Sequence, residues 1–186
     1  MDTFVLAQVF VCISCLIYST SLLFKAKSTL LFLQIISAIF FVTQYFLLGA
    51  YIGAIVAILE TLRSITFYFI DKKFNKKKVR IIASYTFVFI GFISAIFTWE
   101  AWFSILPLLG LTAVSVCLGF ENVLYLKLSC TFSAFCAIIY MLFLNSIFGA
   151  ATQIFIVIVG LIGVALYVKK NKNKQQNNEV ETSLKE

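Results

Sequence analysis

The sequence predicts an all-α membrane protein with seven transmembrane helices, arranged as two parallel three-helix bundles that one linker helix joins. Three observations lead to this fold class. Seven apolar stretches are each long enough to cross a bilayer, the lysines gather in alternate gaps between these stretches, and the first three stretches resemble the last three.

The composition favours a bilayer as the solvent. The chain has 186 residues, of which 62% are hydrophobic and only 12% charged, and its mean hydropathy of +1.02 lies far above that of soluble domains. We expect a single transmembrane domain over residues 1–170. The polar segment 171–186, rich in Asn, Gln, Lys and Glu, is expected to be a disordered cytoplasmic tail.

The apolar stretches define the expected helices. A helix needs roughly 17 to 25 mostly apolar residues to cross the hydrocarbon layer. The stretches that qualify are 3–23, 29–48, 50–70, 81–98, 102–119, 124–144 and 146–168. Gly49, Glu100 and Asn145 mark some of the breaks, and the basic loop 71–80 is the clearest one. No basic segment precedes the first stretch, which favours a spanning helix over a cleaved signal peptide.

The basic residues predict the orientation, because short loops rich in Lys and Arg stay in the cytoplasm. With seven spans and the N-terminus outside, the inner side receives every lysine and arginine of the loops, and the outer side receives none. These residues are Lys25, Lys27, Lys72, Lys73, Lys76, Lys77, Lys78, Arg80, Lys169, Lys170, Lys172 and Lys174. Lys127 is expected to extend its amine to the same surface. The C-terminus is therefore predicted to be cytoplasmic.

An internal repeat divides the helices into two groups. A shift of 96 residues, without a gap, aligns Ser37-Ala38 with Ser133-Ala134 and Gly53-Ala54 with Gly149-Ala150. The shift pairs a first bundle, 3–70, with a second bundle, 102–168, and leaves 81–98 as the linker helix. An odd linker allows both bundles to keep one orientation, and parallel repeats of this kind are a known transporter design.

Several chemistries are excluded by residue type. The chain has no histidine, which excludes His-ligated metals and haem as well as Ser-His-Asp triads. Its five cysteines all lie in apolar runs and are assigned no chemistry. Without a nucleophile and base we expect no enzyme activity, no metal and no cofactor. The net charge of +7 lies between spans, which favours lipid headgroups over nucleic acid as the partner.

Glu60 and Arg63 are the only charged residues in the middle of an apolar stretch, and they lie three residues apart on one side of the helix. Each would cost roughly 2.5 to 3.5 kcal/mol at the bilayer centre if it were unpaired. The cost is relieved if the two pair with each other, if Glu60 is protonated, or if both face a wet cavity. Alternatively, Arg63 extends toward Asp71, about 12 Å away along the helix.

Two interpretations of this pair remain open. In the first, Arg63 binds a polar or anionic solute at the midplane and Glu60 couples protons. In the second, the two form a buried ion pair that orients the helix. The repeat aligns them with Ile156 and Val159, so the charges belong to the first bundle alone.

Uncharged polar residues and one proline complete the candidates. Gln34 and Gln153 lie within spans, where they either line the same cavity or form interhelical hydrogen bonds. Pro107 lies in the fifth stretch and marks either a hinge or a static kink.

The segment KSTLLFLQIISAIFFVTQYFLLGAYIGA, from Lys27 to Ala54, followed by Glu60 and Arg63, resembles the YgjV-type bacterial inner-membrane proteins. Its features are a basic loop, a helix ending in Tyr-x-Leu-Leu-Gly, and Gly-Ala before a helix with an interior arginine. With the two bundles and their linker, the chain is also similar to the SWEET and PQ-loop superfamily, which includes PnuC-type vitamin-precursor transporters. The resemblance covers residues 1 to about 170 and implies a location in the bacterial cytoplasmic (inner) membrane.

The chain departs from that superfamily in two respects. Its first helix has no proline, and no residues match the tryptophan and asparagine pairs that contact sugar in SWEETs, so sugar transport is not carried over. The function expected is a transporter or facilitator of a small polar or anionic solute by alternating access, with the substrate unassigned. The alternative is a non-transporting structural or regulatory membrane protein. A second copy of the chain is a further candidate partner.

Overall fold

The computed structural model describes residues 3–47, 51–74, 76–97, 105–120, 122–143 and 147–183. These residues form seven α-helices and one π-helical turn. Apart from the polar end of α7, the helices are predominantly apolar, and a helix is the conformation in which an apolar segment satisfies its own backbone hydrogen bonds without water. The breaks expected at Gly49, Glu100 and Asn145 lie outside the described residues.

The helices follow the expected stretches closely. Their bounds are α1 Thr3–Leu23, α2 Lys27–Leu47, α3 Tyr51–Phe69, the π-helical turn η1 Ile70–Phe74, α4 Lys77–Phe97, α5 Ile105–Leu118, α6 Val123–Phe143 and α7 Ile147–Ser183. The basic segment 71–80 differs from the loop that was expected. Most of it is helical, in η1 and in the first turn of α4, because Lys and Arg are strong helix formers.

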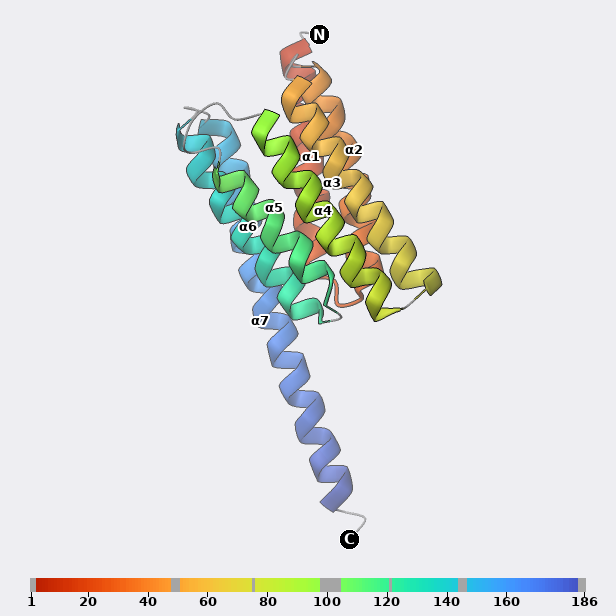
Figure 1. Ribbon diagram of the computed structural model, residues 1–186. Helices are drawn as coiled ribbons and strands as arrows, with labels where there is room; N and C mark the ends of the chain where they lie inside the picture. Colours follow the sequence, from red (N-terminus) through yellow and green to blue (C-terminus); the bar gives the residue numbers. More distant parts are fainter. Residues whose placement is uncertain are drawn as a thin grey trace.

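Helix α7 is much longer than the apolar stretch that predicted it. It continues as helix to Ser183, through most of the segment 171–186 for which disorder was expected. Lys, Gln and Glu in this segment have high helix propensity, which lets the helix propagate beyond its apolar part. In Figure 1 the end of α7 therefore extends well past the other helices.

Four helices are long and apolar enough to cross a membrane. Within the described residues these spans are Val5–Leu23, Lys27–Leu47, Val123–Phe143 and Ile147–Asn171, and α5 is a shorter apolar helix. Large apolar side chains also cover the outside of the bundle, for example Phe89 and Ile96 of α4, which are 67% and 75% exposed. Such a continuous apolar exterior is suited to contact with lipid. Seven spans remain a prediction.

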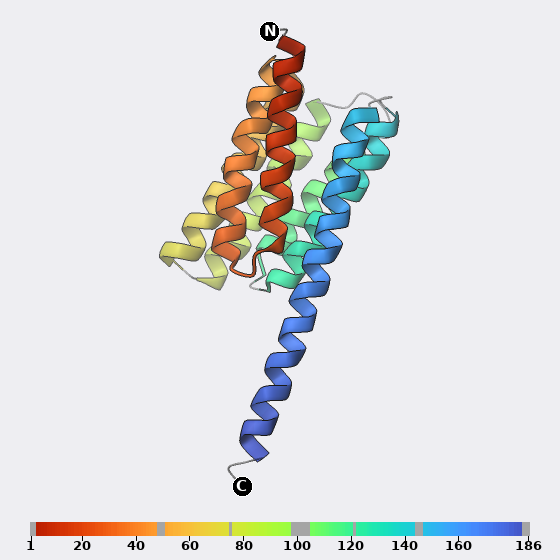
Figure 2. The ribbon, with the colours of Figure 1, turned by 180° about the vertical axis from the view of Figure 1, so that it is seen from behind.

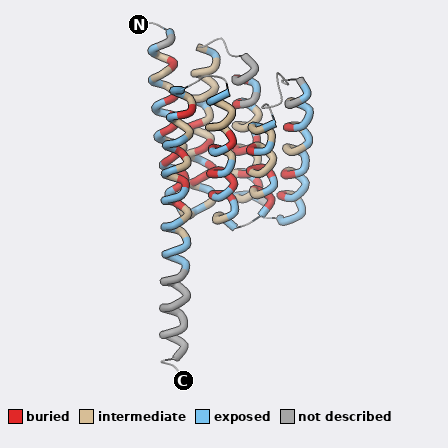
Figure 3. The backbone as a smooth tube through the Cα atoms, turned by 90° about the vertical axis from the view of Figure 1, so that its left-hand side faces the viewer, coloured by how far each residue is buried: buried red, intermediate tan, exposed pale blue. Residues whose placement is uncertain are grey.

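The helices pack mainly against their neighbours in sequence. α2 lies between α1 and α3, α6 lies between α5 and α7, and α1 packs against α7. α4 packs mainly on α5 and only lightly on α3. Figures 1 and 2 show the resulting bundle from opposite sides. In Figure 3 the buried positions lie within the bundle and the exposed positions on its outer faces.

Small residues lie where helices approach most closely. The Ser14 and Ser37 hydroxyls donate to each other's backbone carbonyl, at 2.7 and 2.9 Å, and so join α1 to α2. A Cβ on Gly110 of α5 would lie 3.1 Å from the Ser133 Cα of α6. Gly163 of α7 packs directly on the backbone of Leu22 in α1. Close backbone approach at small residues is the usual basis of helix association in membranes.

The connections α1–α2, α3–α4 and α5–α6 lie together at one end of the bundle, opposite the N-terminus (Figure 1). These connections and the adjoining helix ends contain Lys25, Lys27, the lysines of the α3–α4 segment and Lys127. We call this the basic end. All of the loop lysines predicted for one side therefore share one end of the molecule. Which side of the membrane that end faces remains a prediction.

Candidate functional site

Arg63 in the middle of α3 reaches across the bundle to α5. Its side chain is buried, with 6% of the residue exposed. The Nη1 atom donates hydrogen bonds to the Leu111 carbonyl at 3.3 Å and to Ser115 Oγ at 3.1 Å. The Ser115 hydroxyl in turn donates to the same Leu111 carbonyl at 2.8 Å. The guanidinium is thus held by two neutral acceptors of one helix.

Arg63 has neither of the charged partners considered from the sequence. Asp71 is bound by Lys27 and Arg80, and within the described part of the chain no ion pair joins Arg63 to Glu60 or to any other carboxylate. The Arg63 Nε atom is buried without a hydrogen-bond partner. The spacing of three residues places Glu60 and Arg63 on the same side of α3 but does not determine the direction of their side chains. The guanidinium of Arg63 points toward its acceptors on α5 and does not pair with Glu60.

Glu60 is half-buried and lies on the part of α3 that faces two tyrosines of the first half of the chain. It interacts electrostatically with Tyr18 of α1 and with Tyr45 of α2. Tyr18 is also within electrostatic range of Arg63. The two charges of α3 therefore share a neighbour, Tyr18, although they do not pair directly.

A second polar contact joins α2 to α6 close to these residues. Gln34, 7% exposed, donates from Nε2 to the Cys130 sulfur at 3.5 Å. The Cys130 thiol also interacts with the Tyr18 hydroxyl and with the charge of Arg63. We call the residues that meet here the central polar cluster: Tyr18, Gln34, Glu60, Arg63, Ser115 and Cys130. They come from α1, α2, α3, α5 and α6.

Two of the sequence candidates lie apart from this cluster. Gln153 is half-buried on α7 and, among the described residues, forms no hydrogen bond with the cluster; the carbonyl of its neighbour Thr152 accepts the Cys15 thiol at 3.6 Å. Pro107 is the third residue of α5. In the first turn a proline removes no hydrogen bond from the helix, and its role as a hinge stays a prediction.

Three members of the cluster were not singled out from the sequence: Tyr18, Ser115 and Cys130. In an apolar stretch, a serine or a cysteine looks like any small packing residue, and tyrosine is common throughout this chain. No local pattern distinguishes them, because their polarity matters only through the helices that they meet. No group of His, Cys, Asp or Glu among the described residues is suited to hold a metal.

A pocket of about 450 Å³ lies between α4, α5 and the start of α6. Its lining includes Lys77, Ser84 and Asn122, with Tyr85 and Tyr125 at its sides. The Ser84 hydroxyl donates to the Ser115 carbonyl at 2.7 Å. One residue of α5 therefore contacts both the pocket wall and Arg63.

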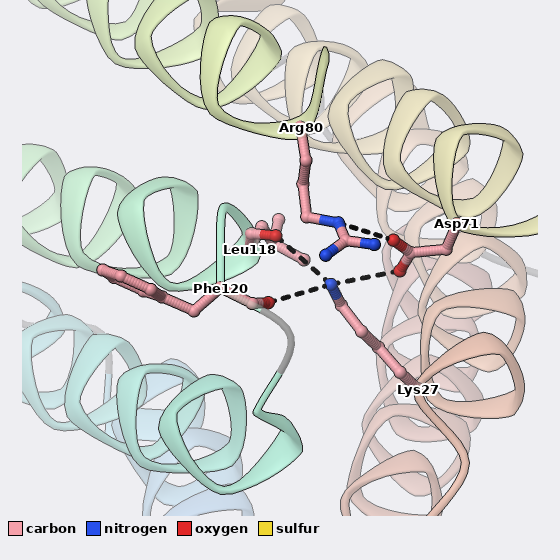
Figure 4. Close-up of polar contacts among 5 residues, drawn as sticks. All are labelled: Lys27, Asp71, Arg80, Leu118 and Phe120. Atoms are coloured by element: carbon pink, nitrogen blue, oxygen red, sulfur yellow. Dashed lines mark hydrogen bonds and ion pairs between the residues drawn. The ribbon is translucent and has the colours of Figure 1, made fainter. Parts of the chain in front are cut away.

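An ion-pair network closes the basic end between the two halves of the chain (Figure 4). Arg80 Nε of α4 donates to Asp71 Oδ1 at 2.9 Å, and Lys27 Nζ of α2 lies 3.1 Å from Oδ2. The Lys27 amine also donates to the carbonyls of Leu118 and Phe120, both at 3.2 Å. We call these residues the Asp71 network. It ties α2, η1 and α4 to the end of α5.

Lys127 of α6 differs from its expected position at the surface. Only 1% of the residue is exposed. Its amine donates to the Gly163 carbonyl of α7 at 3.3 Å and lies 5.4 Å from the centre of the Tyr167 ring. The carbonyl and the ring supply the partial negative charge that turns this side chain inward instead of toward water.

These features define a helical membrane protein whose apolar exterior encloses a largely apolar core with buried polar and charged side chains. A family model described as "Bacterial inner membrane protein", Imp-YgjV, matches residues 5–174. The chain belongs to this family of bacterial inner-membrane proteins. Comparisons with curated proteins and with solved structures gave no match. The YgjV-type resemblance drawn from Lys27–Ala54, Glu60 and Arg63 is thereby confirmed.

Proposed function

We propose that the protein moves a small polar or anionic solute across the inner membrane by alternating access, with the central polar cluster as the binding site. The observation that carries the proposal is the environment of Arg63. A guanidinium deep in the bundle that, among the described residues, is held by a carbonyl and a hydroxyl and has an unsatisfied Nε atom has capacity for an anion. Intramembrane charged residues of this kind usually mark a solute pathway.

A carboxylate or phosphate of the solute would compete well for Arg63. A carboxylate or phosphate can accept two parallel hydrogen bonds from the guanidinium and neutralises its charge, which the carbonyl and the hydroxyl do not. An entering anion would therefore displace the Ser115 hydroxyl and the Leu111 carbonyl, and would satisfy the Nε atom as well. Because both acceptors belong to α5, the exchange would release α3 from α5. Glu60, next to Tyr18 and Tyr45, is the candidate for proton coupling.

The proposed moving parts are two three-helix units, α1–α3 and α5–α7, linked by α4 in the 3+1+3 manner of the SWEET and PQ-loop superfamily. Contacts at the 96-residue offset support this division. The pair Ser14 and Ser37 joins α1 to α2, and the aligned pair Gly110 and Ser133 joins α5 to α6. Gln34 contacts Cys130, the residue with which the offset aligns it. If a two-fold axis relates the two units, a residue close to that axis contacts its equivalent in the other unit, as Gln34 contacts Cys130.

The Asp71 network would act as the gate of the basic end in this mechanism. It joins the first unit and α4 to the end of α5, so it must open before a solute can leave on that side. The pocket that Ser84 lines is the candidate route from the basic end, since the Ser84 hydroxyl is one hydrogen bond from Ser115.

A structural or regulatory role without transport is the second candidate. Two observations favour it: Arg63 is 6% exposed, and the pocket lining includes neither Arg63 nor Glu60. In this case Arg63 only fixes α3 against α5, and the interior stays closed.

Cysteine labelling separates these candidates before a substrate is known. Ser115→Cys is introduced into a cysteine-free variant in membrane vesicles and is treated with a membrane-impermeant methanethiosulfonate on each side. A transporter opens its interior, so position 115 should react from at least one side. Ser129→Cys is the matched control, because the buried Ser129 hydroxyl bonds only the Leu126 carbonyl of its own helix. No reaction at position 115 under any condition would eliminate alternating access.

Transport itself is then measured on proteoliposomes. Currents on a solid-supported membrane are recorded while a panel of organic anions and neutral polar solutes is applied. Solutes that give a signal with the wild type should give none with Arg63→Ala, and Glu60→Gln should abolish any dependence on the proton gradient. An Arg63→Ala protein that transports at the wild-type rate would exclude the proposed site.

A further inference from the structure

The basic end carries a second group of cations, which differs from the Asp71 network in that no carboxylate of the described residues forms an ion pair with it. Its centre is Lys127 of α6, whose amine contacts the Gly163 carbonyl and the Tyr167 ring of α7. Both contacts offer partial negative charge, and neither neutralises a full positive charge. The side chain is 1% exposed, so water does not compensate for this deficit.

Two further lysines gather beside it. Lys25 lies in the short connection between α1 and α2, and its positive charge acts on Lys127. The Lys25 amine also lies within interaction range of the Lys170 amine on α7, and desolvation followed by this neighbouring charge lowers the pKa of Lys25. Lys25 is therefore a neighbour of both Lys127 and Lys170, at the place where α6 and the end of α1 pack on the same part of α7. Among the described residues none of the three pairs with a carboxylate.

Neighbouring positive charges without a carboxylate between them favour the binding of an anion. Like charges repel strongly in a medium of reduced dielectric constant, and lysines that could point to open water have no reason to converge. Lys25 and Lys170 are accessible, since Lys170 is exposed and Lys25 is half-buried, whereas Lys127 lies beneath them. An anion that approached from the surface would therefore meet two accessible amines and, behind them, one buried amine.

We propose that Lys25, Lys127 and Lys170, with Tyr167, bind the phosphate of an anionic phospholipid headgroup. The position favours a lipid over a soluble anion. The site lies at the end of the apolar part of α7, where the span Ile147–Asn171 terminates, and this is the level of the headgroups. Exposed apolar residues of α7, such as Leu166 at 52%, continue from the site along the helix and suit the acyl chains. Basic pockets between helices are known to hold anionic headgroups.

The site has a structural consequence for the bundle. It joins the α1–α2 connection to α6 and α7, at the place where Gly163 packs on Leu22. A bound headgroup would therefore hold the end of α1 against α7. This inference does not depend on transport, because a non-transporting membrane protein would need the same lipid contact.

Native mass spectrometry of the full-length protein tests the proposal. The protein is mixed with phosphatidylglycerol, and separately with phosphatidylcholine, in detergent micelles. The wild type should retain phosphatidylglycerol and release phosphatidylcholine. Lys25→Gln combined with Lys170→Gln should weaken phosphatidylglycerol binding by about tenfold or more, because each lysine contributes to headgroup attraction. Lys170 is exposed, Lys25 is half-buried in a connection, and neither forms an ion pair among the described residues, so this double variant should fold normally.

The matched control removes the same charge elsewhere on the basic end. Lys76→Gln combined with Lys78→Gln changes two exposed lysines of the α3–α4 segment and should leave phosphatidylglycerol binding unchanged. An equal loss in both double variants would reduce the effect to general surface charge and overturn the site. Retained binding in the Lys25 and Lys170 variant, or displacement of the lipid by inorganic phosphate at the same concentration, would also overturn it.

Discussion

The Asp71 network and the proposed lipid site of Lys25, Lys127 and Lys170 lie at the same end of the bundle. Each contains a buried cation. Arg80 and Lys127 are 2% and 1% exposed, yet Arg80 binds a carboxylate at 2.9 Å whereas Lys127 contacts a carbonyl and an aromatic ring. Arg63 resembles Lys127, since it too is held by neutral acceptors. Arg80 is neutralised by a carboxylate within the fold. Lys127 and Arg63 contact neutral groups and therefore retain capacity for an external anion.

The largest effect on the free energy of unfolding should come from breaking the Asp71 network. Asp71→Asn preserves the shape of the side chain but removes the charge that neutralises Lys27 and Arg80. Leaving buried cations without their partner costs about 3 to 5 kcal/mol, which should appear in the free energy of unfolding in mixed micelles. Lys78→Gln, an exposed position, should change this free energy by less than about 0.5 kcal/mol. Equal values for the two variants would mean that the network does not stabilise the fold.

A smaller loss is expected at Arg63, where only neutral acceptors are involved. Ser115→Ala removes one of the two acceptors of the guanidinium, and a hydrogen bond to a charged group is worth about 1.5 to 3 kcal/mol. Ser129→Ala removes a buried hydroxyl that bonds only its own helix and should cost less. The same unfolding measurement compares them. A larger loss for Ser129→Ala would contradict the role of Ser115 in joining α3 to α5.

The contact between Gln34 and Cys130 should contribute less again. Gln34→Leu removes an amide–thiol hydrogen bond of 3.5 Å, and interhelical hydrogen bonds in membranes average about 0.6 kcal/mol. Because Gln34 and Cys130 belong to the central polar cluster, the proposed binding site, the loss of this bond should affect solute binding more than stability. Loss of folded protein on this substitution would indicate a structural role instead.

The smallest effect on stability is expected at Lys127, in spite of its burial. Lys127→Met keeps the length of the side chain and removes an uncompensated charge, so the free energy of unfolding without lipid should stay within about 1 kcal/mol of the wild type. Arg80→Met, at an equally buried position, should be strongly destabilising. Added phosphatidylglycerol should stabilise the wild type but not Lys127→Met. A large decrease in the free energy of unfolding of Lys127→Met without lipid would mean that Lys127, like Arg80, stabilises the fold.

Most of the helix positions were predictable because the pattern is coarse. Apolar stretches such as 3–23 and 124–144 differ from the observed helices by at most a few residues. The α3–α4 segment and the end of α7 were harder, since Lys, Gln and Glu are hydrophilic and yet favour helix. Hydropathy predicts where a chain leaves the membrane but not where its helix ends.

The candidate site was predictable only in part. Arg63 and Gln34 were identifiable as polar residues within apolar stretches, and both are members of the central polar cluster. Ser115 and Cys130 were not, because they become important only through Arg63 and Gln34 on other helices. Lys127 was expected at the surface, and only the proximity of Gly163 and Tyr167 on α7 explains why it is buried.

The sequence by itself determined that this is a helical membrane protein with its loop lysines in alternate gaps, since hydropathy and charge are local properties of each segment. The tertiary structure decided which partner each buried cation has. Glu60 on the same helix and Asp71 in the adjoining η1 were both candidate partners of Arg63, but the guanidinium donates to Leu111 and Ser115 of α5. Contacts between helices depend on how the helices pack against each other, and a single sequence does not contain that information in any local pattern.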